Sequence, residues 1–231
     1  MIVVVFNKPD FEYDVHSLLK EFFPQEDVQM YYSCSPDEVE GKNLACTHHE
    51  MTDDGVKEFS DASQVFKIDY VGEEIAVEWT LNMVGDKVDR EKISVTGADR
   101  KETKNRLKLA LYSMIEKGTG KSLPWGTLSG IRPTKIAMKC IEDGMSDKET
   151  YDYLKETYLA SDEKIDLSIG IAKREKALLD KVDYDNGYSL YIGIPFCPST
   201  CAYCSFTSYP LGVWKNRVDD YLDALEKEID Y

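Results

Sequence analysis

Basic residues are in short supply in this sequence. Its 231 residues include 28 Lys and Arg against 43 Asp and Glu, which gives a formal net charge of −15 at pH 7. A chain this acidic is repelled by phosphate backbones and by anionic lipid headgroups. Proteins that hold nucleic acid through non-specific charge are therefore excluded, and we expect no nucleic-acid partner.

Long hydrophobic runs are missing as well. Runs such as Ile2–Phe6 are far shorter than the about 20 residues that cross a bilayer, and no basic segment precedes this one as in a secretory signal. We expect no membrane span and a cytoplasmic location. The hydrophobic content of 42% still allows a buried core, and the length predicts one large domain or two small ones.

Cysteine is sparse too. Six cysteines in a chain of this size, without a secretory signal, argue against a disulfide framework and for a reducing compartment. Three of the six, Cys197, Cys201 and Cys204, nevertheless fall within eight residues. Such clustering is typical of a metal centre.

The first half of the chain has the pattern of a mixed α/β domain. An amphipathic helix that ends at Pro24 separates two short apolar runs, and alternating residues around Gly72 indicate an antiparallel hairpin. The polar stretch 33–63 predicts mostly loop. We predict strands over 2–6, 28–32, 65–71, 74–83 and 93–96.

Helical signals dominate the region before residue 180. An apolar stripe from Leu107 to Ile115 predicts a helix capped by Gly118. Ser146 and Glu149 have the spacing of a capping box. One face of the last helix in this region is predicted to carry Leu167, Ile171 and Leu178.

The segment 123–135, LPWGTLSGIRPTK, is rich in Gly and Pro and predicts an ordered connection. Two readings of its basic residues stay open. Arg132 and Lys135 could contact an anionic propionate or phosphate, or the segment could simply pack between domains.

A turn cluster at 183–187 predicts a domain boundary. Residues 1–187 would form an α/β extension domain whose C-terminal half is helical, and 188–231 would begin a second domain. There we predict a strand over 188–194, a loop with the three cysteines, and an amphipathic helix from Val218 to the end of the chain.

The cysteines are spaced C-x3-C-x2-C. Three thiolates from one loop can ligate three irons of a cubane cluster, whereas an ordinary electron-transfer cluster takes four cysteines, so this loop indicates a cluster with one open iron. A zinc site that uses the distant Cys46, His48 and His49, or three thiols without a metal, are the alternatives.

The residues around this loop resemble a known family. YIGIPFC from Tyr191 to Cys197, followed by CAYC, is similar to the first strand and cluster loop of the radical S-adenosylmethionine superfamily, in its oxygen-independent coproporphyrinogen III oxidase branch. WGTLSGIRPTK further resembles the HemZ-type coproporphyrinogen dehydrogenases. Close agreement covers 188–231. The resemblance implies that this part is the first β-loop-α unit of a TIM-like partial barrel.

The resemblance also implies cofactors and residue roles. Cys197, Cys201 and Cys204 would ligate a 4Fe-4S cluster, and Tyr191 and Tyr203 would contact S-adenosylmethionine. Strand packing is the alternative for Tyr191, and a plain aromatic lid over the cluster for Tyr203. No catalytic residue is assigned.

The activity implied is an oxidoreductase step of haem biosynthesis, the oxidative decarboxylation of coproporphyrinogen III propionates to vinyl groups. A flavodoxin or ferredoxin would donate electrons. Gly193, where many such oxidases have His, and Ser205-Phe206, where some relatives have a further cysteine, bring the chain closer to HemZ-type and haem-chaperone-like relatives. A haem-binding paralogue without decarboxylase activity is therefore one alternative.

A partner-docking role for residues 1–187 is another alternative. Only 231 − 187 = 44 residues remain for a barrel that needs about 200 or more. From this we expect an N-terminal piece of a longer enzyme that is inactive alone.

Overall fold

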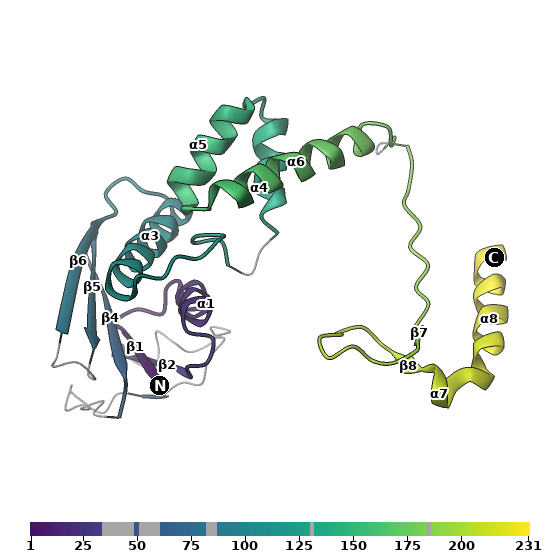
Figure 1. The fold of residues 1–231 in the computed structure, drawn as a ribbon, viewed down its shortest axis with the longest axis horizontal. Coiled ribbons are helices and arrows are strands. Elements are labelled where there is room, and N and C mark those ends of the chain that lie inside the picture. Colours follow the sequence, from purple (N-terminus) through teal and green to yellow (C-terminus); the bar gives the residue numbers. More distant parts are fainter. Residues whose placement is uncertain (34–48, 51–60, 82–86, 130–131, 184–185) are drawn as a thin grey trace. The chain divides into compact units, whose positions relative to one another are not determined.

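The computed structural model describes residues 1–33, 49–50, 61–81, 87–129, 132–183 and 186–231. They form two compact units, Met1–Lys181 and Val182–Tyr231. The fold is mixed α/β, as predicted (Figure 1). The domains 1–187 and 188–231 stay predictions, since compactness alone does not establish independent folding. None of the helices in the described ranges is long and apolar enough to cross a membrane.

Among the described residues of the first unit, six strands form one mixed sheet. The strands are β1 (Ile2–Phe6), β2 (Val28–Tyr32), β3 (His49–Glu50), β4 (Gln64–Val71), β5 (Glu74–Leu81) and β6 (Lys87–Ser94). Their order is β3-β2-β1-β4-β5-β6. β1 pairs in parallel with β2 and β4, whereas β4, β5 and β6 pair antiparallel. β1 is thus a central strand.

Side chains of β1 are buried on both faces of the sheet. Ile2, Val4 and Phe6 join a core with helices α1 (Glu12–Phe22) and α3 (Arg100–Thr119), which lie on one side of the sheet (Figure 1). Val3 and Val5 join a smaller cluster of their own. A continuous apolar run is what a parallel strand covered on both faces requires.

The hairpin predicted around Gly72 is confirmed, with Val71 opposite Glu74 and a positive φ of 61° at Gly72. The strand predicted at 93–96 is longer than expected and begins at Lys87. Its sequence, KVDREKIS, carries charged residues on both faces, which hides the strand pattern. The loop predicted over 33–63 lies mostly outside the described residues, and β3 falls within it.

The end of α3 corrects another prediction. Gly118 is not the cap, because α3 continues through Thr119 and Gly120 caps it with a φ of 70°. The N–H of Gly120 donates to the Glu116 carbonyl at 2.7 Å. Gly118 instead faces Trp79, where an added Cβ would lie 2.3 Å from the indole ring. Glycine at 118 therefore permits close packing of α3 on the sheet.

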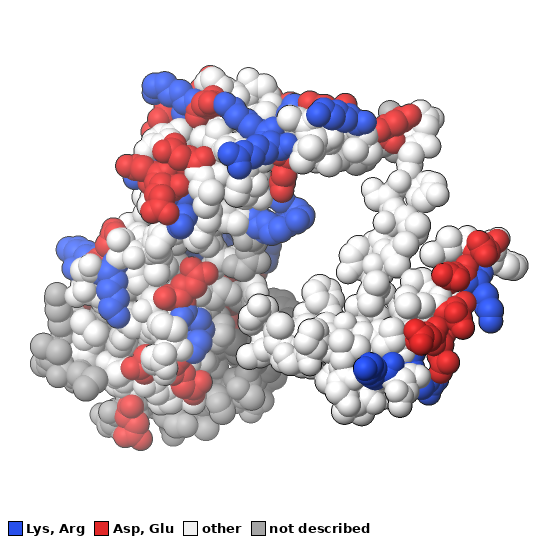
Figure 2. Space-filling model, turned by 45° about the vertical axis from the view of Figure 1, so that its right-hand side comes forward, with Lys and Arg blue, Asp and Glu red and all other residues white. Residues whose placement is uncertain are grey.

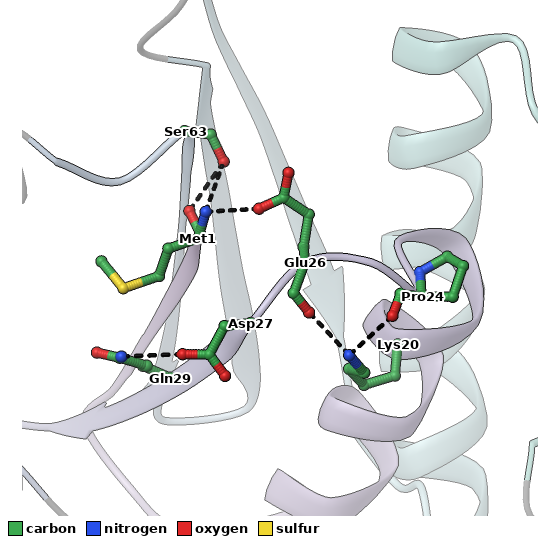
Figure 3. A network of polar contacts seen from close by, with 7 residues as sticks. All are labelled: Met1, Lys20, Pro24, Glu26, Asp27, Gln29 and Ser63. Carbon is green, nitrogen blue, oxygen red and sulfur yellow. Dashed lines mark hydrogen bonds and ion pairs between the residues drawn. The ribbon is translucent and has the colours of Figure 1, made fainter.

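Polar contacts hold the turn between α1 and β2 (Figure 3). The N-terminal ammonium of Met1 lies 2.5 Å from a carboxylate oxygen of Glu26. The Lys20 ammonium donates to the carbonyl oxygens of Pro24 and Glu26 at 3.1 and 2.8 Å. The turn that leads into the central strands is thus fixed by backbone acceptors as well as by an ion pair.

Three helices complete the first unit, as predicted for 136–180: α4 (Thr134–Glu142), α5 (Asp147–Tyr158) and α6 (Asp162–Leu179). The buried side chains of α6 include Ile165, Ile169 and Ala172. The face predicted from spacing is the wrong one. Leu167 and Leu178 are 44% and 65% exposed, because the helix turns its neighbouring stripe toward α4 and α5.

The capping box predicted at the start of α5 is confirmed. The Ser146 hydroxyl accepts from the Glu149 N–H, and the Glu149 carboxylate accepts from the Ser146 N–H at 2.7 Å. We expect Ser146→Ala to lower the free energy of unfolding by about 1 kcal/mol, since a helix N–H loses its partner. Chemical denaturation measures this change.

Ser161 offers the matched control, because it starts α6 without a side-chain capping bond. Ser161→Ala should leave the free energy of unfolding nearly unchanged. Equal losses in the two variants would contradict the role of the capping box.

The second unit is small. Its elements are β7 (Phe196–Cys197), β8 (Tyr209–Pro210), α7 (Leu211–Trp214), the 3-10 helix η1 (Lys215–Arg217) and α8 (Val218–Asp230). The helix predicted from Val218 is confirmed. The strand predicted over 188–194 is not formed, because no strand of the described chain pairs with this segment and an extended segment without a partner makes no ladder. The barrel unit as a whole stays a prediction.

Candidate metal centre

The three clustered cysteines lie on a loop that is closed at its base. Phe196 and Cys197 of β7 pair in parallel with Tyr209 and Pro210 of β8. The Tyr209 N–H also donates to the Pro195 carbonyl at 2.8 Å. Both ends of the loop are therefore held together, and all three thiols lie on this one short loop.

All three are free thiols with access to solvent. Cys201 is exposed, and Cys197 and Cys204 are half-buried. The N–H of Cys204 donates to the Cys201 carbonyl at 3.0 Å, which forms a turn between the second and third cysteines. The Cys204 thiol lies 3.8 Å from the Phe206 carbonyl. A metal ion or cluster could therefore reach each sulfur from outside.

The thiols do not converge, however. Within the ranges that the structure describes, no three His, Cys, Asp or Glu side chains are gathered closely enough to hold a metal ion. Three thiolates brought together repel one another, and the metal–sulfur bonds supply the free energy that offsets this repulsion. The structure therefore brings the predicted ligands onto one loop but not into one coordination site.

An aromatic cluster braces the loop against the last helix. The Phe196 ring meets Tyr221 of α8 edge to face, with ring centroids 5.4 Å apart. Tyr209 lies 6.0 Å from Phe196 and 5.0 Å from Trp214. The Tyr221 hydroxyl donates to the Gly193 carbonyl at 2.6 Å. Tyr221 thus fixes both the lead-in segment and the first residue of β7.

The amphipathic helix predicted from Val218 includes Tyr221, but its pattern does not reveal this bracing role. The i, i+3 spacing of Val218 and Tyr221 was its one signal, and that spacing does not reveal which partner the ring meets. Gly193 was noted as a departure from the family's His. Its carbonyl oxygen proves to be the acceptor for Tyr221.

The predicted cofactor-contacting tyrosines are almost fully exposed. Tyr191 is 88% and Tyr203 is 91% exposed. Strand packing, the alternative for Tyr191, therefore does not occupy its ring in this structure. Phe206 is 82% exposed, whereas Phe196 packs inward. The loop presents two phenols and a phenyl ring to any ligand that binds there.

The loop also lies in an uncharged stretch. Residues 186–214 contain no Asp, Glu, Lys or Arg. In Figure 2 this stretch of the second unit is white, and colour appears along the helices that follow it. Fewer charges and fewer bound waters around an iron–sulfur cluster are among the properties that set its reduction potential.

The alternative zinc ligands cannot be placed. Cys46 and His48 lie outside the described residues, and only the backbone of His49 is described, in β3. Cys140 is buried in α4 of the first unit, where burial raises the pKa of its thiol. A thiol of raised pKa is a poor metal ligand near neutral pH.

Part of this chain is similar to a known protein. No family model matches the chain. A protein of Bacillus subtilis (strain 168), named oxygen-independent coproporphyrinogen-III oxidase-like protein HemZ, is 39% identical over 130 residues. The match covers 56% of this chain and 26% of that protein. The chain is therefore related, over about half its length, to a HemZ protein and spans about a quarter of it.

Proposed function

We propose that the cysteine loop holds the cluster of a radical S-adenosylmethionine enzyme that converts coproporphyrinogen III propionates to vinyl groups. The observation that carries this proposal is the set of three free, accessible thiols with C-x3-C-x2-C spacing on one braced loop. The name of the B. subtilis relative supports the substrate class.

The donor set fits a 4Fe-4S cluster by its chemistry, since thiolates are the usual protein ligands of such clusters. Cys197, Cys201 and Cys204 would each ligate one iron. When bound, the cluster and S-adenosylmethionine would supply an electron and a 5′-deoxyadenosyl radical able to remove a hydrogen atom from a propionate side chain.

The chain's own residues would position S-adenosylmethionine and shield the cluster. Tyr191 and Tyr203 present free phenol rings that can stack on an adenine or donate a hydrogen bond. Tyr221 holds the lead-in through the Gly193 carbonyl, which limits how far Tyr191 can move. The uncharged stretch 186–214 would place none of its own charged side chains beside the cluster.

Anaerobic reconstitution tests the proposal. The chain is incubated with iron and sulfide, reduced, and examined by electron paramagnetic resonance with and without S-adenosylmethionine. We expect iron uptake and a changed signal on addition of S-adenosylmethionine, because an open iron accepts the new ligand. Tyr191→Ala should weaken this response severalfold.

Tyr188→Ala is the matched control, since Tyr188 is also 88% exposed but lies outside the predicted contact positions. Failure to take up iron, or a signal that S-adenosylmethionine leaves unchanged, would refute the cluster assignment. The decarboxylation is tested separately with coproporphyrinogen III. Tight haem binding without carbon dioxide release would favour the haem-chaperone alternative.

A further inference from the structure

The first unit contains a cavity of about 480 Å³, built wholly from its own residues. We call it the lysine pocket. It lies among α1, α3, α4, α5 and the segment 127–129, and its volume is within the range of small-molecule sites. Its charged lining consists of Lys101, Lys104, Lys108, Lys135, Lys139, Asp14 and Asp143.

Positive charge dominates this lining. Both aspartates are already engaged, Asp14 with Lys104 at 3.5 Å and Asp143 with Lys139 at 2.5 Å. The five lysines and two aspartates leave three lysines over, 5 − 2 = 3. Within the described chain, the remaining Lys101, Lys108 and Lys135 form no ion pair with a carboxylate. In a chain with a net charge of −15, such a surplus is a local exception.

Lys108 is the deepest of these cations, at only 6% exposed. Its ammonium donates to the Ser129 hydroxyl at 2.8 Å, which uses one of three N–H donors. Burial lowers the pKa of Lys108, since desolvation disfavours the charged form. The carboxylates of Asp14 and Glu21 favour its charged form, but neither forms an ion pair with it. The buried ammonium therefore lacks the paired carboxylate that such a group normally has.

Residues 127–129 and Lys135, which belong to the segment WGTLSGIRPTK, line the pocket. Gly126 has a φ of +58°, and a Cβ there would lie 1.9 Å from the Tyr158 carbonyl oxygen. This close approach brings the Thr127 N–H to the same carbonyl at 2.8 Å. Thr127 and Ser129 are consequently buried against the pocket. Lys135, whose role the sequence left open, lines the pocket from the start of α4.

Part of the pocket lining is apolar. It includes Leu128, Ile136, Met145, Tyr153 and Tyr158. The two tyrosine rings meet edge to face with centroids 5.8 Å apart, so they form a rigid wall. A cation cluster beside a rigid aromatic wall suits a ligand that is charged at one end only.

We propose that the lysine pocket binds a small organic anion. Its phosphate or carboxylate lies among the unpaired Lys101, Lys108 and Lys135, and its apolar body lies against Leu128 and Tyr153. The lysine ammonium is a flexible point charge that can bind either head group. The site belongs to Met1–Lys181 and does not depend on the cluster. The proposed anion site can therefore fail its test while the proposed cluster passes its own, and the reverse.

The test titrates the 231-residue chain with three probes that share a phenyl ring: phenyl phosphate, 3-phenylpropionate and the neutral benzyl alcohol. Backbone amide shifts in 1H–15N spectra report binding. We expect saturable shifts confined to 101–108, 127–129 and 135–140 with at least one anion. The tighter of the two anions identifies the head group.

Variants then locate the anion. Lys135→Gln and Lys108→Met should each weaken binding about tenfold, the effect of losing one charged hydrogen bond. Lys135 is exposed, so its variant stays informative even if Lys108→Met fails to fold. Lys148→Gln is the control, because Lys148 is exposed on α5, pairs with Asp152 and does not line the pocket.

Three results would overturn the proposal. They are an absence of saturable shifts at the pocket with either anion, equal shifts of the same amides with benzyl alcohol, and weakening of binding by Lys148→Gln as large as that by Lys135→Gln. Binding that survives Cys201→Ala would show that the pocket stands apart from the cluster.

Discussion

Replacing Cys201 by alanine is expected to abolish iron binding at the cysteine loop. Cys201 is the middle ligand of three, and its loss leaves two thiols, which cannot hold three irons of a cubane. The visible absorption from sulfur-to-iron charge transfer and the iron content per chain should both fall to background after anaerobic reconstitution. The fold should persist, since Cys201 is exposed and supports no packing.

Cys140→Ala is the control for this experiment. Cys140 is a thiol on α4 in the other unit, buried beside the lysine pocket. Its removal should leave the iron content unchanged, although a small cavity costs some stability. Iron content that survives Cys201→Ala, or that falls equally in both variants, would contradict the assigned ligands.

Replacing Gly126 by alanine is expected to lower the free energy of unfolding of the first unit by about 3 kcal/mol. About 1 kcal/mol arises from a side chain in the left-handed region, and the rest from the collision with Tyr158 and Leu159. The added Cβ would lie 1.9 Å from one carbonyl oxygen and 2.5 Å from the next carbonyl carbon. Urea denaturation measures the loss.

Gly120→Ala separates the two contributions. Gly120 has a φ of +70° but no atom within 4 Å of an added Cβ, so only the conformational cost of about 1 kcal/mol applies. Equal losses in the two variants would contradict the close approach at Gly126. A folded Gly126→Ala protein should also bind phenyl phosphate or phenylpropionate less tightly, because the wall formed by 127–129 would move.

Much of the first unit could be predicted from the sequence because its signals are local. The apolar run Ile2–Phe6 and the alternation around Gly72 reflect periodicities that burial imposes on strands. The capping box at Ser146 is likewise a short-range bond. The face of α6 and the cap of α3 could not be predicted, since they depend on which neighbours the helices meet.

The candidate metal centre, too, could be predicted only in part from the sequence. Spacing alone identifies Cys197, Cys201 and Cys204 as a group, because one loop carries them all. It does not reveal that Tyr221 reaches the Gly193 carbonyl, since that contact joins segments far apart in sequence. The lysine pocket could not be predicted from the sequence for the same reason. Its cations come from two helices, and only the fold places them around one cavity.

The position of β1 has a consequence for biosynthesis. Ile2 pairs on one side with Val28 and on the other with Gln64 of β4. At about 5 to 20 residues per second, a ribosome takes about 3 to 12 s to make the chain between Phe6 and Gln64. During that interval one edge of a fully apolar strand has no partner, which is the condition under which nascent chains aggregate or recruit chaperones. The strand at the centre of the finished sheet is therefore exposed to aggregation while the protein is being made.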